Sequence, residues 1–279
     1  MDALVSTEWL AGELGAADLR IVDATYCPFD PAREPEAEYV AGHIPGAVFL
    51  DLGGLADPAT DLPGMVPPAG MFAERMTALG LATDQRIVLY DDSPNRTSPR
   101  AWWMLKLHGA RHVAILDGGL AKWKAEGRPL GTGHEIGTGP GFAVARDVAT
   151  LRDLDAMRRN QAEGGAQVVD ARSEARFSGA EADPRTGVAP GHIPGSVNIP
   201  YGRMFNPDGT WKQGDVLRAA FDAAGVDLDK PIIMTCGSGV TAAGLMFGAR
   251  LLGARDVALY DGSWSEWGAD PMTDKAVTA

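Results

Sequence analysis

The chain has 279 residues, of which 45% are hydrophobic, and its 25 basic and 37 acidic residues give a net charge of −12. This balance is typical of a globular protein and excludes the broad basic surface by which proteins bind nucleic acids or anionic membranes. No apolar run is long enough to span a membrane, and Met1–Val5 lacks the basic start and apolar core of a secretory signal.

Short apolar runs alternate with helix-like segments through the first half of the chain. Strands are expected at 19–23, 47–50 and 86–90, and a helix at 69–80. A polar stretch after the first strand leads to the motif Gly-His-Ile-Pro-Gly at 42–46. Strands of four or five residues that alternate with helices predict an α/β fold with a mainly parallel sheet.

The second half repeats this order of elements and some of its motifs. The motif at 42–46 returns at 191–195, Ile-Val-Asp-Ala at 21–24 returns as Val-Val-Asp-Ala at 168–171, and Gly-Ala-Arg at 109–111 returns at 253–255. The offsets between the copies are 149, 147 and 144 residues. Because this period is far too long for a solenoid, it indicates a duplicated domain.

A glycine-rich stretch without an apolar period, from Gly131 to Gly141, joins the two halves. Such a composition is typical of a linker. We therefore predict two α/β domains, at 1–135 and 136–279, with a linker at about 130–145. Each domain is expected to be a mainly parallel sheet flanked by helices.

Only two cysteines are present, Cys27 and Cys236. Two distant cysteines make neither a disulfide framework nor a metal cluster, so we expect a reducing compartment, the cytoplasm, and neither a metal nor a cofactor. A lone thiol is either a small core side chain or a reagent. Nothing chemical surrounds Cys27, for which we expect a core position.

Cys236 follows the apolar run at 231–235 and opens the segment Cys-Gly-Ser-Gly-Val-Thr-Ala. Gly237 and Gly239 allow backbone conformations that a β-carbon opposes, and a helix is expected from Thr241 onward. A thiol in this place faces backbone N–H groups and the amino terminus of a helix, both of which favour negative charge. The segment therefore predicts a reactive thiolate rather than a structural cysteine.

The duplication indicates which half is active. At a constant offset of 144 residues, the counterpart of Cys236 is Asp92. Because only the second copy carries a thiol in this loop, we predict a catalytic second domain and an inactive first domain.

Together, the two Gly-His-Ile-Pro-Gly motifs and the late Asp-Gly turns resemble the tandem rhodanese-domain sulfurtransferases, across nearly the whole chain. The segment at 236–242 is similar to the loop of the 3-mercaptopyruvate sulfurtransferases. Relatives that use thiosulfate carry Arg and Lys after the cysteine, where Gly237 and Ser238 stand in this chain. Thiosulfate is a compact dianion that gains from two added cations, whereas mercaptopyruvate carries a single carboxylate.

This resemblance implies an activity. A Cys236 persulfide would carry sulfur from a small-molecule donor, 3-mercaptopyruvate, to a thiol acceptor such as thioredoxin or a small thiol, or to cyanide, with release of pyruvate. It also implies that Arg176 and Arg185, nine residues apart, bind the carboxylate and carbonyl of the substrate. The remaining residues expected to bind substrate are Gly237, Gly239, Val240 and Thr241.

The same resemblance suggests how protons are handled. Ser238 is expected to donate a proton or a hydrogen bond to the substrate carbonyl, and His43 with Asp30 are candidates for a proton relay to it. His192 occupies the same motif position as His43, although only one half carries the thiol loop. A turn-forming role for both histidines is therefore the alternative.

Three other functions share parts of these motifs. A thiosulfate:cyanide sulfurtransferase of the same fold is disfavoured by Gly237 and Ser238. A phosphatase with a Cys-x5-Arg loop needs an arginine six residues after the cysteine, where Ala242 stands. A non-enzymatic sulfur-carrier or regulatory module is disfavoured because inactive rhodanese domains usually lack the cysteine. The sequence thus predicts an enzyme of sulfur transfer.

Overall fold

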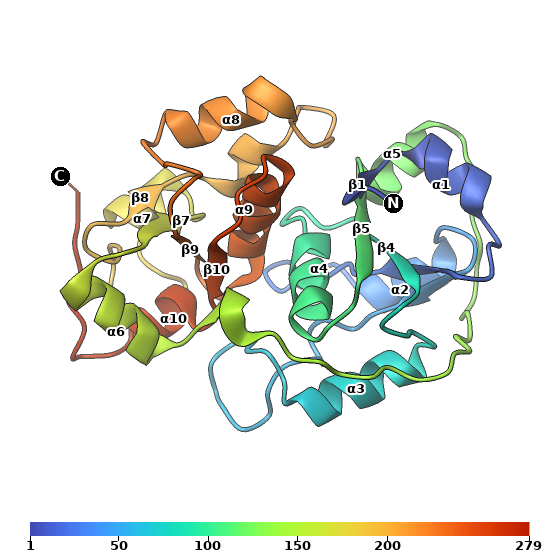
Figure 1. The fold of residues 1–279 in the computed structure, drawn as a ribbon, viewed down its shortest axis with the longest axis horizontal. Helices are drawn as coiled ribbons and strands as arrows, with labels where there is room; N and C mark the ends of the chain where they lie inside the picture. The colour runs from blue at the N-terminus through green and yellow to red at the C-terminus, as the bar shows by residue number, and fades with distance from the viewer. Residues whose placement is uncertain (279) are drawn as a thin grey trace. The chain divides into compact units, whose positions relative to one another are not determined.

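The computed structural model describes residues 1–278 as two compact α/β units (Figure 1). The first contains β1 (Leu4–Val5), α1 (Thr7–Glu13), β2 (Leu19–Asp23), α2 (Pro35–Ala41), β3 (Ala47–Phe49), α3 (Ala69–Ala78), β4 (Arg86–Tyr90), α4 (Ser98–Leu107), β5 (His112–Leu116) and α5 (Gly119–Ala125). Its strands form a parallel sheet in the order β1-β5-β4-β2-β3.

The second unit repeats this topology with the order β6-β10-β9-β7-β8, also parallel. Its elements are η1 (Val148–Thr150), β6 (Leu151–Arg152), α6 (Leu154–Glu163), β7 (Gln167–Asp170), α7 (Glu174–Ser178), β8 (Val197–Asn198), η2 (Tyr201–Met204), α8 (Gly214–Asp222), β9 (Ile232–Thr235), α9 (Val240–Leu251), β10 (Val257–Tyr260) and α10 (Ser263–Trp267). The predicted fold class is confirmed.

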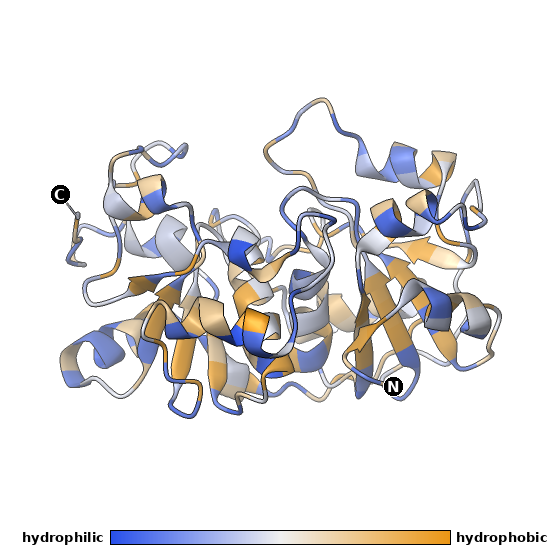
Figure 2. Cartoon of the chain, turned by 90° about the horizontal axis from the view of Figure 1, so that it is seen from above, coloured by the Kyte–Doolittle hydropathy of each residue, from blue (hydrophilic) through white to orange (hydrophobic). Residues whose placement is uncertain are grey.

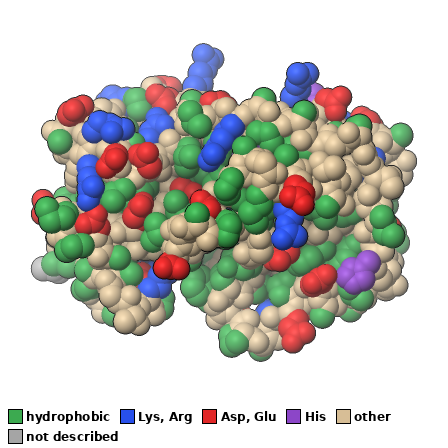
Figure 3. Space-filling view, turned by 90° about the horizontal axis from the view of Figure 1, so that it is seen from below, with side chains coloured by type: hydrophobic (Ala, Val, Ile, Leu, Met, Phe, Trp, Pro, Cys, Tyr) green, Lys and Arg blue, Asp and Glu red, His purple; other side chains and the backbone are tan. Residues whose placement is uncertain are grey.

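The strands of both sheets are mainly hydrophobic (Figure 2). β9 reads Ile-Ile-Met-Thr and β10 reads Val-Ala-Leu-Tyr, and all eight side chains are buried. Helices cover both faces of a parallel sheet, so such strands carry no polar side. On the outside, acidic and basic side chains are interspersed over the face drawn in Figure 3.

The boundary between the units lies later than the predicted position between residues 135 and 136. The first unit extends to Asp147, and the second begins at Val148. The backbone N–H groups of Ala145 and Asp147 donate to the carbonyls of His108 (3.1 Å) and Leu107 (2.8 Å). The glycine-rich stretch is therefore part of the first unit's surface and not a free linker.

Close packing explains the glycines of this stretch. A β-carbon on Gly137 would lie 1.9 Å from the carbonyl oxygen of Leu79, and one on Gly139 would lie 2.4 Å from that of Gly80. A side chain is excluded at Gly137 and Gly139 because the stretch runs directly against the backbone at the end of α3 there. Composition alone does not distinguish this packing from the flexibility of a linker.

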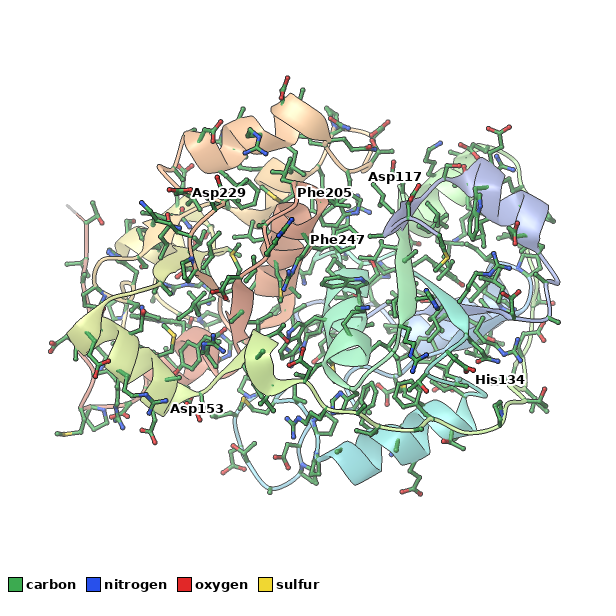
Figure 4. The ribbon with its side chains drawn as sticks, in the orientation of Figure 1. Asp117, His134, Asp153, Phe205, Asp229 and Phe247 are labelled. Atoms are coloured by element: carbon green, nitrogen blue, oxygen red, sulfur yellow. The ribbon has the colours of Figure 1, made fainter. Side chains whose placement is uncertain are left out.

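Two short segments also leave the half in which they occur in sequence. Residues 206–211 belong to the first unit, where the N–H of Trp211 donates to Oδ1 of Asp117 at the end of β5 (2.8 Å; Figure 4). Residues 58–65 belong to the second unit. None of the helices in residues 1–278 is both long and apolar enough to cross a membrane.

An aspartate ends the same strand in each unit, and the two are neutralised differently. Asp170 forms a buried ion pair with Arg172, with 2.7 Å between Oδ2 and Nη2. Asp23 is equally buried but has only hydroxyl and N–H partners, among them the Thr25 hydroxyl at 2.5 Å. Burial outweighs these hydrogen bonds and raises the pKa of Asp23 to about 6.

This difference predicts a pH dependence of stability. Between the unfolded pKa of 3.8 and the folded pKa of about 6, the folded chain binds the Asp23 proton more tightly, so stability falls as pH rises through this window. Relative to Asp23→Asn, the wild type should lose about 2 kcal/mol of unfolding free energy between pH ~4 and ~7. Urea unfolding of both proteins at each pH measures this difference. A difference that stays constant over that range would contradict the assignment.

Candidate active site

The site is built around the carboxyl end of β9, the middle strand of the second sheet. In the strand register, Thr235 pairs with Asp170 of β7, and its carbonyl accepts a hydrogen bond from the N–H of Ala171 (2.9 Å). Cys236 follows directly and is 2% exposed. Ligand sites of open parallel sheets lie at this edge, because the loops after neighbouring strands converge there.

The loop after Cys236 presents backbone N–H groups. Gly239 adopts a left-handed conformation (φ 76°) and begins α9, whose first residues Val240 and Thr241 are half-buried. Among the described residues, no acceptor is assigned to the N–H groups of Gly237 and Ser238. Unpaired N–H groups at the amino terminus of a helix favour an anion, which fits a thiolate or a persulfide at Cys236.

The start of α10, which follows β10, forms hydrogen bonds to the backbone of this loop. The N–H groups of Trp264 and Ser265 donate to the carbonyls of Cys236 (3.0 Å) and Gly237 (2.9 Å). The hydroxyl of Ser265 also donates to the carbonyl of Gly237. These three hydrogen bonds tie the backbone of the loop to α10.

Arg176 on α7 and Arg185 in the following loop both lie over Gly237. A β-carbon at Gly237 would be 3.3 Å from Nη1 of Arg185 and 3.5 Å from Nη2 of Arg176. Both side chains are about one-fifth exposed. The Nε of Arg176 is buried and has no partner in the part of the chain that the structure describes. The structure thus brings the two predicted arginines to the residue next to Cys236.

Asp183 joins the two guanidinium groups. Nη2 of Arg176 donates to its Oδ2, and Nη1 of Arg185 lies 3.2 Å from its Oδ1. Burial alone would raise the pKa of Asp183, but the N–H of Arg185 and the two guanidinium groups outweigh it and hold that pKa below its ordinary value. The three side chains together therefore carry a net charge of about +1.

Ser238 lies on the same loop, half-buried. No hydrogen bond of its hydroxyl to another described residue is found. Its carbonyl oxygen is 3.7 Å from the β-carbon position of Gly64, in the segment of residues 58–65 that joins this unit. The hydroxyl is therefore available to a bound substrate.

The equivalent loop of the first unit carries a carboxylate where the second carries the thiol. The residue after the strand is Asp91, because Tyr90 pairs with Asp23 as Thr235 pairs with Asp170. The expected counterpart, Asp92, is thus one position too late. The second half has one residue fewer between the end of its strand, β9, and the Gly-Ala-Arg motif than the first half has after β4. An alignment on that motif therefore places the counterpart of Cys236 one position too late.

Comparison with known proteins identifies the family. A match to the rhodanese-like domain covers residues 6–126 and again residues 153–270. The chain belongs to the rhodanese-like family. The predictions of two rhodanese-like domains and of a sulfurtransferase are thereby confirmed.

Individual rhodanese-like relatives match along nearly the whole chain. The chain is 41% identical to 3-mercaptopyruvate sulfurtransferase of Escherichia coli (strain K12) over 95% of its own length and 94% of that protein. It is 38% identical to thiosulfate/3-mercaptopyruvate sulfurtransferase 1, mitochondrial, of Arabidopsis thaliana, over 97% and 77%. The crystal structure of SseA from Escherichia coli matches with a TM-score of 0.86 and 38% identity, over 95% and 99%.

The histidines of the two Gly-His-Ile-Pro-Gly motifs occupy the same environment in each rhodanese-like unit. His43 is fully buried, stacks on Tyr39 at 4.2 Å between ring centroids, and has its Nδ1 2.8 Å from the Tyr39 carbonyl. His192 stacks on Phe177 at 3.9 Å, with its Nδ1 2.8 Å from the Phe177 carbonyl. These contacts favour the turn-forming alternative over a relay role for His43.

Asp30, the other relay candidate, is exposed in the first unit. Its Oδ1 accepts a hydrogen bond from the N–H of Ala32 (3.1 Å), a local turn contact. Sequence reasoning missed Asp183 as a site residue. The sequence contains a signal for it, because Asp183 lies seven residues after Arg176 and two before Arg185, and a carboxylate between two arginines can pair with both.

The contact over Gly237 gives a first test of the site. Gly237→Ala should raise the KM of the sulfur donor by roughly three- to tenfold, because the added methyl group displaces the two guanidinium groups that are expected to bind the donor's carboxylate. Gly237 does not have a positive φ, so alanine fits its backbone. Steady-state kinetics measures the effect.

Gly244→Ala in α9 is the matched control. A β-carbon there meets nothing within 4 Å, so KM should stay unchanged and stability should rise by about 0.5–1 kcal/mol. An unchanged KM in Gly237→Ala would show that the arginines do not bind the donor over this residue.

Proposed function

We propose that this chain is a 3-mercaptopyruvate sulfurtransferase that works through a persulfide of Cys236. The observation that carries the proposal is the meeting of Arg176, Arg185 and the Cys236 loop over Gly237. With Asp183 included, the binding group has a net charge of about +1, which balances one carboxylate. The name of the Escherichia coli relative supports the same donor, and that of the Arabidopsis thaliana relative includes it beside thiosulfate.

The chemistry follows from these groups. The Cys236 thiolate attacks the sulfur of mercaptopyruvate, an S–S bond forms, and the C–S bond breaks with its electron pair moving to carbon as pyruvate enolate. The arginines hold the carboxylate and the carbonyl oxygen on which the enolate charge develops. The donor's thiol proton stays on the outer sulfur of the new persulfide and then passes to the enolate carbon, which gives pyruvate and the persulfide anion. The Ser238 hydroxyl donates a hydrogen bond at the carbonyl.

The second half-reaction returns the free enzyme. A thiolate acceptor attacks the outer sulfur of the persulfide, and the Cys236 thiolate leaves. We propose a small thiol or a protein thiol of the thioredoxin kind as the acceptor. Cys27 and Cys236 are both free thiols, which fits the reducing environment of the cytoplasm in which such acceptors are available.

Measuring both donors side by side tests the proposal. Purified protein with a thiol acceptor should release pyruvate from mercaptopyruvate, with a kcat/KM larger than that for thiosulfate. Cys236→Ser should abolish turnover, because the hydroxyl is not ionised near neutral pH and forms no persulfide. Cys27→Ser serves as the control and should retain activity. A kcat/KM that favours thiosulfate would sink the donor assignment.

The charge of the binding group makes a separate prediction about donor choice. Asp183→Asn leaves the two guanidinium groups without a counter-charge, so the dianion thiosulfate should gain relative to the monocarboxylate donor. We expect the thiosulfate-to-mercaptopyruvate ratio of kcat/KM to rise by about tenfold. Arg176→Ala should lower this ratio, because it removes a positive charge. A ratio that moves in the same direction in both variants would contradict this account.

A further inference from the structure

We propose that Ser263 is a positioning residue that fixes the backbone of the nucleophile Cys236 through a hydrogen bond to its N–H. No contact of Ser263 with a substrate is needed for this role. The argument begins from its backbone, since Ser263 and Arg96 are the only non-glycine residues with positive φ within residues 1–278, both at 50°. Such a conformation is unfavourable for a residue with a β-carbon and persists only where the surroundings enforce it.

The hydroxyl of Ser263 gives a reason for the strained conformation. The side chain is fully buried, its Oγ accepts from the N–H of Cys236 (3.2 Å), and its hydroxyl donates to the carbonyl of Tyr260 (2.8 Å). The second bond directs the hydroxyl proton away, so that a lone pair faces Cys236. In this way the end of β10 orients the residue at the end of β9.

The inactive unit shows what the position looks like without this task. The N–H of Leu120 donates to the carbonyl of Asp91 (3.2 Å), as that of Trp264 donates to Cys236 (3.0 Å). The counterpart of Ser263 is Gly119, at φ 58°. A β-carbon on Gly119 would lie 2.4 Å from the Asp91 carbonyl oxygen. The first unit, which carries Asp91, thus has a glycine at this positive-φ position. The second unit, which carries Cys236, has a serine there in spite of the backbone strain.

The consequence concerns the N–H groups that face the sulfur. The bond to Ser263 fixes the peptide before Cys236, while Trp264 and Ser265 fix the two carbonyls that follow it. With these groups held, the N–H groups of Gly237 and Ser238 remain directed to the side of the loop where an anion binds. Without the Ser263 hydroxyl, a buried N–H loses its acceptor and the loop relaxes to satisfy it.

Ser263→Ala and Ser263→Gly test the proposal. Glycine suits the positive φ, so loss of the hydroxyl is measured in a chain that folds without strain. Two quantities are followed: the steady-state parameters with mercaptopyruvate, and the pH profile of iodoacetamide alkylation at Cys236, resolved from Cys27 by peptide mass spectrometry. We expect kcat to fall about tenfold with KM unchanged, and the midpoint of the alkylation profile to rise by about one pH unit, in both variants.

Ser196→Ala is the matched control. The Ser196 hydroxyl also donates to the carbonyl three residues earlier, that of Ile193 (2.6 Å), and the first half has Ala47 at this position. This variant should leave both quantities at their wild-type values. The turnover measurement rests on the proposed function, but the alkylation profile does not. If mercaptopyruvate is not a substrate, the midpoint of the alkylation profile alone tests the positioning role of Ser263.

A merely structural role for Ser263 gives a different pattern. A loosened site changes the plateau rate of alkylation through exposure of the thiol, but leaves the midpoint where it is. A wild-type midpoint in both Ser263 variants, or a midpoint shift of the same size in Ser196→Ala, would overturn the proposal.

Discussion

The structure of each unit depends on holding negative charge at the carboxyl end of its middle strand. The loop that follows turns backbone N–H groups and a helix amino terminus toward one point, and such groups are stable when an anion accepts from them. In the first unit the chain supplies that anion itself, since the Asp91 carboxylate accepts from the N–H groups of Ser93 (3.0 Å) and Ser98 (2.9 Å). In the second unit Cys236 occupies the equivalent place, where the charge would be that of the proposed persulfide. One fold thus uses the same loop once for its own stability and once for chemistry.

In the proposed substrate site, the net charge is set by a third side chain as well as by the two arginines. Two guanidinium groups side by side repel each other, and Asp183 between them holds both at a fixed spacing. The carboxylate is 1% exposed and keeps its charge because both neighbours are cations. What remains for a ligand is a single positive charge with a bidentate geometry. This arrangement favours a monocarboxylate over a compact dianion, and it does so without any cation in the Cys236 loop.

The sequence predicts the repeat, the alternation of strands and helices, and the thiol loop, because each of these rests on local pattern or on glycine stereochemistry. It locates Arg176 and Arg185 only through family resemblance, since nothing local distinguishes them from surface arginines. Other features have physical causes that composition hides. Gly137 and Gly139 serve close packing, and each motif histidine stacks on an aromatic ring of its own unit, a contact that the motif alone does not reveal. Ser263 escapes sequence reasoning because its role depends on a left-handed backbone and on a contact across two strands.

The two halves also show how the anion determines the residues around it. A carboxylate branches, so Asp91 reaches two N–H groups with its own oxygens, and its backbone is held by Leu120 alone among the residues that open α5. A thiolate has a single atom with weak directionality, and its position depends on the backbone that carries it. The second unit therefore fixes the backbone of Cys236 and Gly237 by four hydrogen bonds with the residues that open α10; Cys236 donates one of them to Ser263, and the carbonyls of Cys236 and Gly237 accept the other three. The buried pair of Asp170 and Arg172 extends this support, because the Arg172 guanidinium lies 4.5 Å above the Trp264 ring. The first unit has Asp23 at the place equivalent to Asp170, and among the described residues Asp23 pairs with no arginine there. The Asp91 loop of that unit is thus not supported by a buried ion pair.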